Sequence, residues 1–160
     1  MERTTDRLEV YRELEIAASP ETVWELLVDP DKAVRWWGQA VLIEAWPGGK
    51  LRIEVTPHSI VSGEVLEVDP PRRLVCSWGW ELGGGGPELV PPGSSTVEIE
   101  LLASGTGTRF RLVHRGLPDE GAAASHSAGW DHYLGRLTVA ASGADPGPDP
   151  WRGAAPAADG

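Results

Sequence analysis

Two side chains with useful chemistry, Arg12 and His114, lie in otherwise apolar rows of the sequence. The row of Arg12 also contains Leu8, Val10, Leu14 and Ile16, and the row of His114 contains Phe110 and Leu112. Because alternate residues of a β-strand point to the same face, we expect both polar side chains to point into the protein. A guanidinium there can bind an anionic ligand, and an imidazole can orient a ligand oxygen or act as a general acid or base.

Each of these residues also has a purely structural interpretation, and the sequence leaves both interpretations open. A buried guanidinium without a partner is very costly, so Arg12 has to meet a carboxylate, ordered water or an anionic ligand, unless a bulge turns it outward. His114 is either a core histidine bonded to a backbone carbonyl or a contact for a ligand. The sequence assigns no catalytic residue, and His114 is the one candidate for acid–base work.

Tryptophan is unusually frequent, with eight Trp against one Phe and two Tyr. Trp78 and Trp80 share one row of a predicted strand, Trp130 and Tyr133 share the apolar stripe of a predicted helix, and Trp37 follows a short helix. We expect these five side chains to meet around one space. Indoles are large and rigid and need a partner for the N–H when buried, which suits a cavity wall with a few polar points. Plain core packing is the alternative for the indoles on the strand and the long helix.

Four further residues are assigned either to the core or to the wall of that space. Trp24 and Trp36 stand where short helices must be anchored, which predicts a core role for both. Glu64 and Glu81 are candidate polar members of the wall.

Other chemistry is disfavoured by the spacing of the residues that it needs. His126 and His132 are six residues apart, on opposite faces of a helix and without a cysteine companion, so we predict no metal site. Cys76 lies in an apolar strand with no Gly-x-Ser-x-Gly motif in the chain, which predicts an inert buried thiol. Gly83–Gly86 is followed by neither Lys-Ser/Thr nor a helix, so it predicts a mobile loop rather than a phosphate site. No cofactor is expected.

The elements that must position these residues follow from periodicity and turn signals. Alternation from Leu8 to Ile16 predicts a strand, and Ser19 before Pro20 predicts the start of a short helix that runs through Leu27. A second helical turn is expected from Pro30. Further strands are predicted within 41–45, 51–56, 60–69 (with an irregularity near Gly63), 74–80, 97–101 and 109–114, and a long helix within 121–143.

Composition limits the classes of partner. Fourteen lysines and arginines against 24 aspartates and glutamates give a net charge of −10, which disfavours nucleic acid and anionic membrane surfaces. One cysteine cannot form an internal disulfide, and the chain shows no signal-like leader and no run of about 18 apolar residues. We therefore expect a soluble cytoplasmic protein.

Several short motifs together resemble the SRPBCC (START-like, Bet v 1-like) superfamily, and within it bacterial proteins similar to the C-terminal domain of the heat-shock-protein ATPase activator. They are Ser19-Pro20-Glu21-Thr22-Val23-Trp24, Arg35-Trp36-Trp37-Gly38, Pro47-Gly48-Gly49, Pro70-Pro71-Arg72-Arg73-Leu74, Ser95-Thr96-Val97-Glu98, Gly107-Thr108, His114-Arg115-Gly116-Leu117 and Gly129-Trp130. The resemblance implies an α+β helix-grip fold, in which a curved antiparallel sheet of six to seven strands wraps a long C-terminal helix and two short helices follow the first strand. It also implies a cavity between sheet and helix. We expect one domain over residues 1–143 and a mobile Pro/Gly-rich tail over 144–160.

Three functional hypotheses follow, and they belong to different classes. The first is binding of a small hydrophobic or aromatic molecule in the cavity. Its predicted contacts are Arg12, Trp37, Trp78, Trp80, Phe110, His114, Trp130 and Tyr133. The second is a chaperone-associated or regulatory binding module, and the third is an enzyme of the cyclase, hydratase or hydrolase type that uses His114. A homodimer is compatible with each of them.

Overall fold

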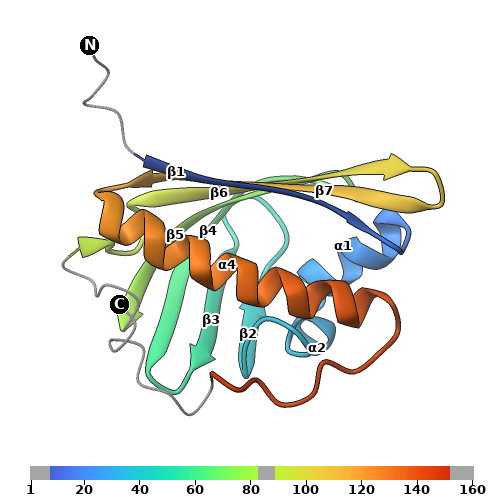
Figure 1. Ribbon diagram of the computed structural model, residues 1–160. Helices are drawn as coiled ribbons and strands as arrows, with labels where there is room; N and C mark the ends of the chain where they lie inside the picture. Colours follow the sequence, from blue (N-terminus) through green and yellow to red (C-terminus); the bar gives the residue numbers. More distant parts are fainter. Residues whose placement is uncertain (1–7, 83–88, 152–160) are drawn as a thin grey trace.

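The computed structural model describes residues 8–82 and 89–151 (Figure 1). Its strands are β1 (Leu8–Ile16), β2 (Ala40–Ile43), β3 (Lys50–Thr56), β4 (Ser59–Asp69), β5 (Arg73–Leu82), β6 (Ser95–Ser104) and β7 (Gly107–Leu117). Its helices are α1 (Pro20–Val28), α2 (Pro30–Ala33) and α4 (Glu120–Ala141). The predicted loop Gly83–Gly86 and the part of the predicted tail beyond Trp151 lie outside the described residues.

One seven-stranded sheet contains all the strands described, in the order β1-β7-β6-β5-β4-β3-β2, and every neighbouring pair is antiparallel. Figure 1 shows α4 along the inner face of the curved sheet, with α1 and α2 at one end. The predicted helix-grip fold is therefore confirmed. A sheet with one apolar face needs a covering layer, and α4 supplies it.

Local capping signals fix where the helices begin and end. The Ser19 hydroxyl accepts a hydrogen bond from the Thr22 backbone N–H at 3.2 Å, as the N-cap prediction required. Asp119 caps α4 in the same way through the Ala122 N–H at 2.8 Å. Gly143 follows α4 with a φ of +93°, which a side chain would oppose.

The irregularity predicted in the fourth strand is present. The pairing of β4 with β5 shifts register between Ile60 and Val61 and again between Val65 and Glu67. Bulges of this kind bend a strand and increase its twist.

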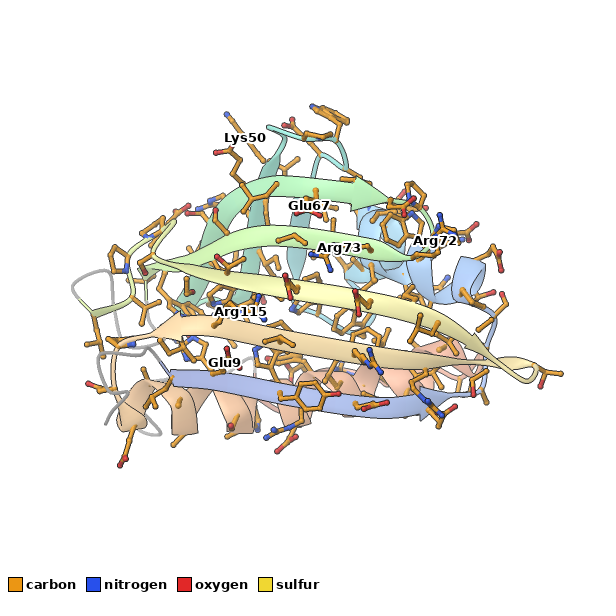
Figure 2. All side chains as sticks on the ribbon, turned by 90° about the horizontal axis from the view of Figure 1, so that it is seen from above. Glu9, Lys50, Glu67, Arg72, Arg73 and Arg115 are labelled. Atoms are coloured by element: carbon orange, nitrogen blue, oxygen red, sulfur yellow. The ribbon has the colours of Figure 1, made fainter. Side chains whose placement is uncertain are left out.

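Alternation gives the sheet an apolar inner face and a charged outer face. Val10 of β1, Ile99 of β6 and Leu112 of β7 are each at most 2% exposed and lie in the core beneath α4. Charged side chains stand on the opposite face, among them Arg73, Arg115 and Glu9 (Figure 2). Successive side chains of a strand therefore point alternately to the core and to the outer face of the sheet.

Candidate functional site

Two tryptophans of β5 point inward on either side of a glycine. A Cβ atom added at Gly79 would lie 2.0 Å from the carbonyl oxygen of Pro91, so only glycine lets the following segment cross the strand here. That crossing is held by a hydrogen bond from the Trp80 backbone N–H to the Val90 carbonyl at 2.8 Å. Trp78 and Trp80 are thereby fixed at adjacent inward positions.

Trp78 lies at the centre of a buried aromatic cluster. Its ring centroid is 5.2 Å from that of Trp130 on α4, 6.3 Å from that of Trp37 and 6.0 Å from that of Trp80. The His114 ring is 5.4 Å away. None of these five side chains is more than 8% exposed. The structure thus brings together indoles from β5, α4 and the segment after α2, which are far apart in the sequence. We call this set, together with His126, the indole–imidazole cluster.

The hydrogen bonds of His114 fix its tautomer. The Trp130 indole N–H donates to His114 Nδ1 at 3.1 Å, so this nitrogen is unprotonated. His114 Nε2 then carries the hydrogen and donates it to the Ser95 hydroxyl at 2.9 Å, while that hydroxyl donates to the Trp78 backbone carbonyl at 2.9 Å. Burial, and secondarily the neighbouring His126, lower the pKa of His114 to about 2. His114 is a neutral core histidine in this arrangement.

His126 is the site residue that sequence analysis missed. Its Nε2 accepts the indole N–H of Trp80 at 3.0 Å, and its Nδ1 donates to the Ala122 carbonyl at 2.7 Å. The His126 ring stands at 88° to that of His114 with centroids 4.8 Å apart. Burial lowers the pKa of His126, although its bond to the Ala122 carbonyl opposes this shift. One signal was available: His126 lies four residues before Trp130 and therefore on the same face of α4.

One fully buried donor of the cluster has no partner in the part of the chain that the structure describes. Within the described residues, Trp78 Nε1 finds no hydrogen-bond acceptor, although its indole is only 4% exposed. The indole nitrogens of Trp80, Trp130 and Trp36 are all bonded, that of Trp36 to the Leu26 carbonyl at 2.8 Å. Burying an N–H without an acceptor costs about 1–3 kcal/mol.

Three other residues that were candidates for the binding space make their contacts outside the cluster. Arg12 points toward α4, as its row predicted, and its Nε donates to Asp131 at 2.6 Å. Glu81 pairs with Arg52 at 3.1 Å on the exposed side of the sheet, and Glu64 is exposed as well. Glu64 and Glu81 are therefore not part of the cluster. Arg12 pairs with a carboxylate, which is one of the partners that the sequence leaves open for it.

Phe110 and Tyr133 are buried but make other contacts. Phe110 is fully buried in β7, four residues before His114, and no ring contact joins it to the cluster within the described part of the chain. The Tyr133 hydroxyl donates to Asp149 Oδ2 at 2.6 Å. The contribution of Arg12, Phe110 and Tyr133 to ligand binding stays a prediction.

Part of the predicted tail packs against α4, and we call residues 145–151 the strap. Asp149 accepts hydrogen bonds from Tyr133, from His132 Nε2 at 2.8 Å and from the Trp151 backbone N–H at 2.9 Å. The Trp151 ring stacks on His132 with a centroid separation of 3.9 Å and an interplanar angle of 5°. Arg136 donates to the Gly147 carbonyl at 2.9 Å. Figure 1 shows this segment returning alongside α4 from the end near α2.

Metal-ligating side chains and the single thiol are the remaining groups with possible chemistry. The described residues contain no set of three or more His, Cys, Asp or Glu side chains placed to hold a metal ion. Cys76 is buried in β5, and burial raises the pKa of its thiol to about 12. A thiol with that pKa is protonated at neutral pH and is a poor nucleophile.

Comparison with known proteins identifies several that resemble this chain. A family model described as "Activator of Hsp90 ATPase homolog 1-like protein" matches residues 17–142. An AHSA1-like protein from Rhizobium etli, solved by solution NMR, is 44% identical with a TM-score of 0.70, over 96% of this chain and 94% of that one. The comparison with curated proteins gave no match.

Two more distant structures share the fold. DynU16, a protein in the dynemicin biosynthetic locus, has a TM-score of 0.74 at 22% identity over 88% of this chain. The matched region covers 50% of DynU16, so this chain spans half of that protein. The Aha1 dimer from Colwellia psychrerythraea has a TM-score of 0.69 at 18% identity, over 84% of this chain and 96% of that one. Among the residues described here, no helix has the length and apolarity needed to cross a membrane.

Proposed function

Because this chain belongs to the Activator of Hsp90 ATPase homolog 1-like protein family, we propose that it uses the interior of this helix-grip fold to bind a small hydrophobic or aromatic molecule. The proposed wall is formed by Trp37, Trp78, Trp80 and Trp130, between the sheet and α4. A cytoplasmic setting, which the single buried and unpaired Cys76 supports, belongs to the same proposal.

The observation that carries the proposal is the unpartnered Nε1 of Trp78. Its indole is buried among flat aromatic faces, and its N–H is a donor that no described residue satisfies. Flat apolar walls with a few placed polar groups are typical of small-molecule sites. A ligand that stacks on the indoles and accepts this hydrogen bond would remove the free-energy cost of burying an unsatisfied N–H.

Ligand titration monitored by tryptophan fluorescence tests the proposal. A panel of neutral aromatic compounds is expected to quench or shift the emission of the native protein in a saturable way. Trp78→Phe should weaken the saturable response. Trp46→Phe is the matched control, since Trp46 is 57% exposed in the loop between β2 and β3. If no compound gives a saturable response, or if the two variants behave alike, the proposal is wrong.

The geometry argues against acid–base catalysis by His114. Both ring nitrogens are occupied, and protonation of Nδ1 would place two N–H donors against each other at the bond to Trp130. A general acid or base needs a pKa near the working pH. The neutral, fully bonded imidazole of His114 serves as a structural partner for the indoles.

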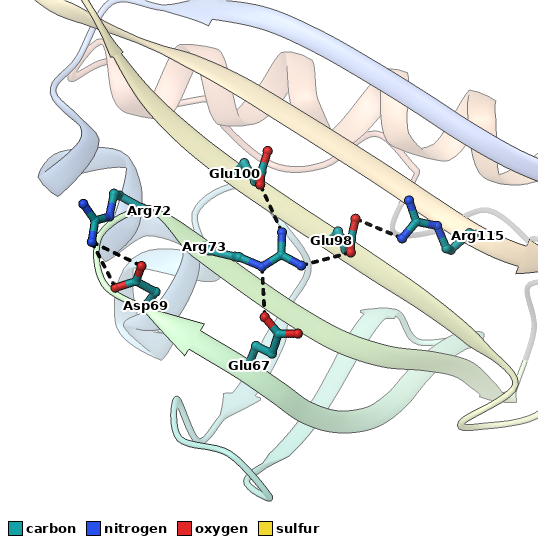
Figure 3. Close-up of polar contacts among 7 residues, drawn as sticks. All are labelled: Glu67, Asp69, Arg72, Arg73, Glu98, Glu100 and Arg115. Carbon is teal, nitrogen blue, oxygen red and sulfur yellow. Dashed lines mark hydrogen bonds and ion pairs between the residues drawn. The ribbon is translucent and has the colours of Figure 1, made fainter.

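An interaction with a chaperone is the second candidate, and the family description is the observation that favours it. It requires a partner surface, and the outer face of the sheet is filled with internal ion pairs. Arg73 bonds Glu67, Glu98 and Glu100, each at 3.0 Å, and Glu98 also meets Arg115 at 3.0 Å (Figure 3). A partner at this face must compete with those pairs. A pull-down with a purified chaperone that returns only background would eliminate this candidate.

A further inference from the structure

We propose that the ligand of this site is uncharged and presents one hydrogen-bond acceptor, an oxygen or a nitrogen, to the indole N–H of Trp78. This inference rests on the proposed function and names the chemical class of the molecule bound. The ligand class follows from which hydrogen-bonding groups of the indole–imidazole cluster are left without a partner among the described residues.

The hydrogen-bonding groups of Trp80, Trp130, His114 and His126 are all matched. The N–H of Trp80 is taken by His126 Nε2, and the N–H of Trp130 is taken by His114 Nδ1. The other nitrogen of each histidine donates, to the Ala122 carbonyl and the Ser95 hydroxyl respectively. Both imidazoles therefore have no acceptor left for a ligand. Among the fully buried side-chain donors of the cluster, Trp78 Nε1 is the one that no described residue satisfies.

A ligand whose second acceptor takes the N–H of Trp80 or Trp130 would have to break an existing hydrogen bond. Taking the N–H of Trp80 would leave His126 Nε2 buried without a donor, and taking the N–H of Trp130 would do the same to His114 Nδ1. Each such exchange creates a new unsatisfied group for every one that it removes. The fully buried groups of the cluster are therefore complementary to one acceptor, with apolar surface around it.

The cluster also lacks a charge that could balance a charged ligand. Both histidines are neutral, because burial lowers the pKa of each. Among the described side chains that are buried, Asp149 is the charged one, and it is bonded to Tyr133 and His132 at the strap. Arg12 is paired with Asp131. A buried carboxylate or ammonium would thus find no counter-ion among the buried side chains that the structure describes, which is very unfavourable.

The acceptor is tested with a matched pair of probes, 9-fluorenone and fluorene. The two compounds are similar in size and flatness, but only fluorenone has a carbonyl oxygen. We expect fluorenone to bind about fivefold more tightly to the native protein, the value of one neutral hydrogen bond. In Trp78→Phe this ratio should fall to about one, and in the Trp46→Phe control it should be kept.

A second measurement reads the hydrogen bond directly in the native protein, and a variant serves only to assign the signal. In a ¹H–¹⁵N spectrum, fluorenone should move one indole N–H signal downfield, and fluorene should not. That signal should be missing from the spectrum of Trp78→Phe. The indole signals of Trp80 and Trp130 should lack this downfield shift, because their N–H groups are already bonded.

The charge is tested with 9-fluorenone-2-carboxylate and its methyl ester. The ester should bind, and the carboxylate should bind at least ~100-fold more weakly, because its charge would be buried without a partner. Equal binding of ester and carboxylate, or equal binding of fluorenone and fluorene, would overturn the proposed ligand class and leave the binding function intact. Failure of all four probes to bind would overturn both.

Discussion

The neutral His114 makes the stability of this protein sensitive to mild acid, and the size of the effect can be worked out. Its pKa is 6.5 in an unfolded chain and about 2 in the folded protein, where burial disfavours the charged form. Below pH 6.5 the unfolded state therefore binds a proton that the folded state does not. By linkage, His114 contributes stability that is fully present above pH 6.5 and is lost as the pH falls toward the folded pKa.

Between pH 7.5 and pH 5 the loss due to His114 amounts to about 2 kcal/mol. The relevant interval is about 1.5 pH units below the unfolded pKa, at about 1.4 kcal/mol for each unit. His126 acts in the same direction, because burial lowers its pKa as well. The free energy of unfolding, measured by urea denaturation at both pH values, should fall accordingly.

Variants separate the histidines from the other titrating groups. His114→Gln should be less stable at pH 7.5, yet it should lose about 2 kcal/mol less than the native protein on going to pH 5. His58→Gln is the matched control, because His58 is exposed in the turn between β3 and β4. If His114→Gln is too unstable to measure, His126→Gln offers the same comparison. The reasoning is refuted if the native protein, His114→Gln and His126→Gln all lose the same free energy of unfolding between pH 7.5 and pH 5.

Three further predictions concern individual contacts. Ser95→Ala leaves His114 Nε2–H without its acceptor and should cost about 1–3 kcal/mol in urea denaturation, and an unchanged midpoint would contradict the hydrogen-bond chain. Tyr133→Phe removes a hydrogen bond to the Asp149 carboxylate and should cost about 1.5–3 kcal/mol in the same assay, and no loss would mean that the strap adds nothing to stability. Cys76, whose pKa burial raises to about 12, should react with a thiol reagent at pH 7.5 only after unfolding, and fast labelling of the native protein would disprove its burial.

The order and the faces of the elements could be predicted because they depend on local signals. The cap at Ser19 and the glycine at 143 are each visible within a few residues, and the structure has both. Alternation in the strands assigned the inward direction of His114 and Trp78 correctly, since the side-chain period of a strand is two. The resemblance to a known superfamily supplied the way the sheet wraps the long helix.

The partners of the inward polar groups could not be predicted in the same way. Arg12 was expected to need a carboxylate, a water or a ligand, and Asp131, 119 residues later, is the group that it meets. For His126 the sequence disfavours a metal site and indicates no other partner, although its distance of four residues from Trp130 places both on one face of α4. The part played by Asp149 was missed because a Pro- and Gly-rich segment carries no periodicity that predicts docking.

By itself, the sequence determined which side chains turn inward, where the helices begin and end, and that many indoles have to be buried. Only the tertiary structure decided that Trp80 bonds His126, that Trp130 bonds His114, and that Trp78 finds no acceptor among the described residues. The reason is physical: burial follows from the pattern along the chain, whereas a hydrogen bond requires two atoms within about 3 Å of each other. The separation of groups that lie 16 or 46 residues apart depends on strand register and on how the helix sits against the sheet.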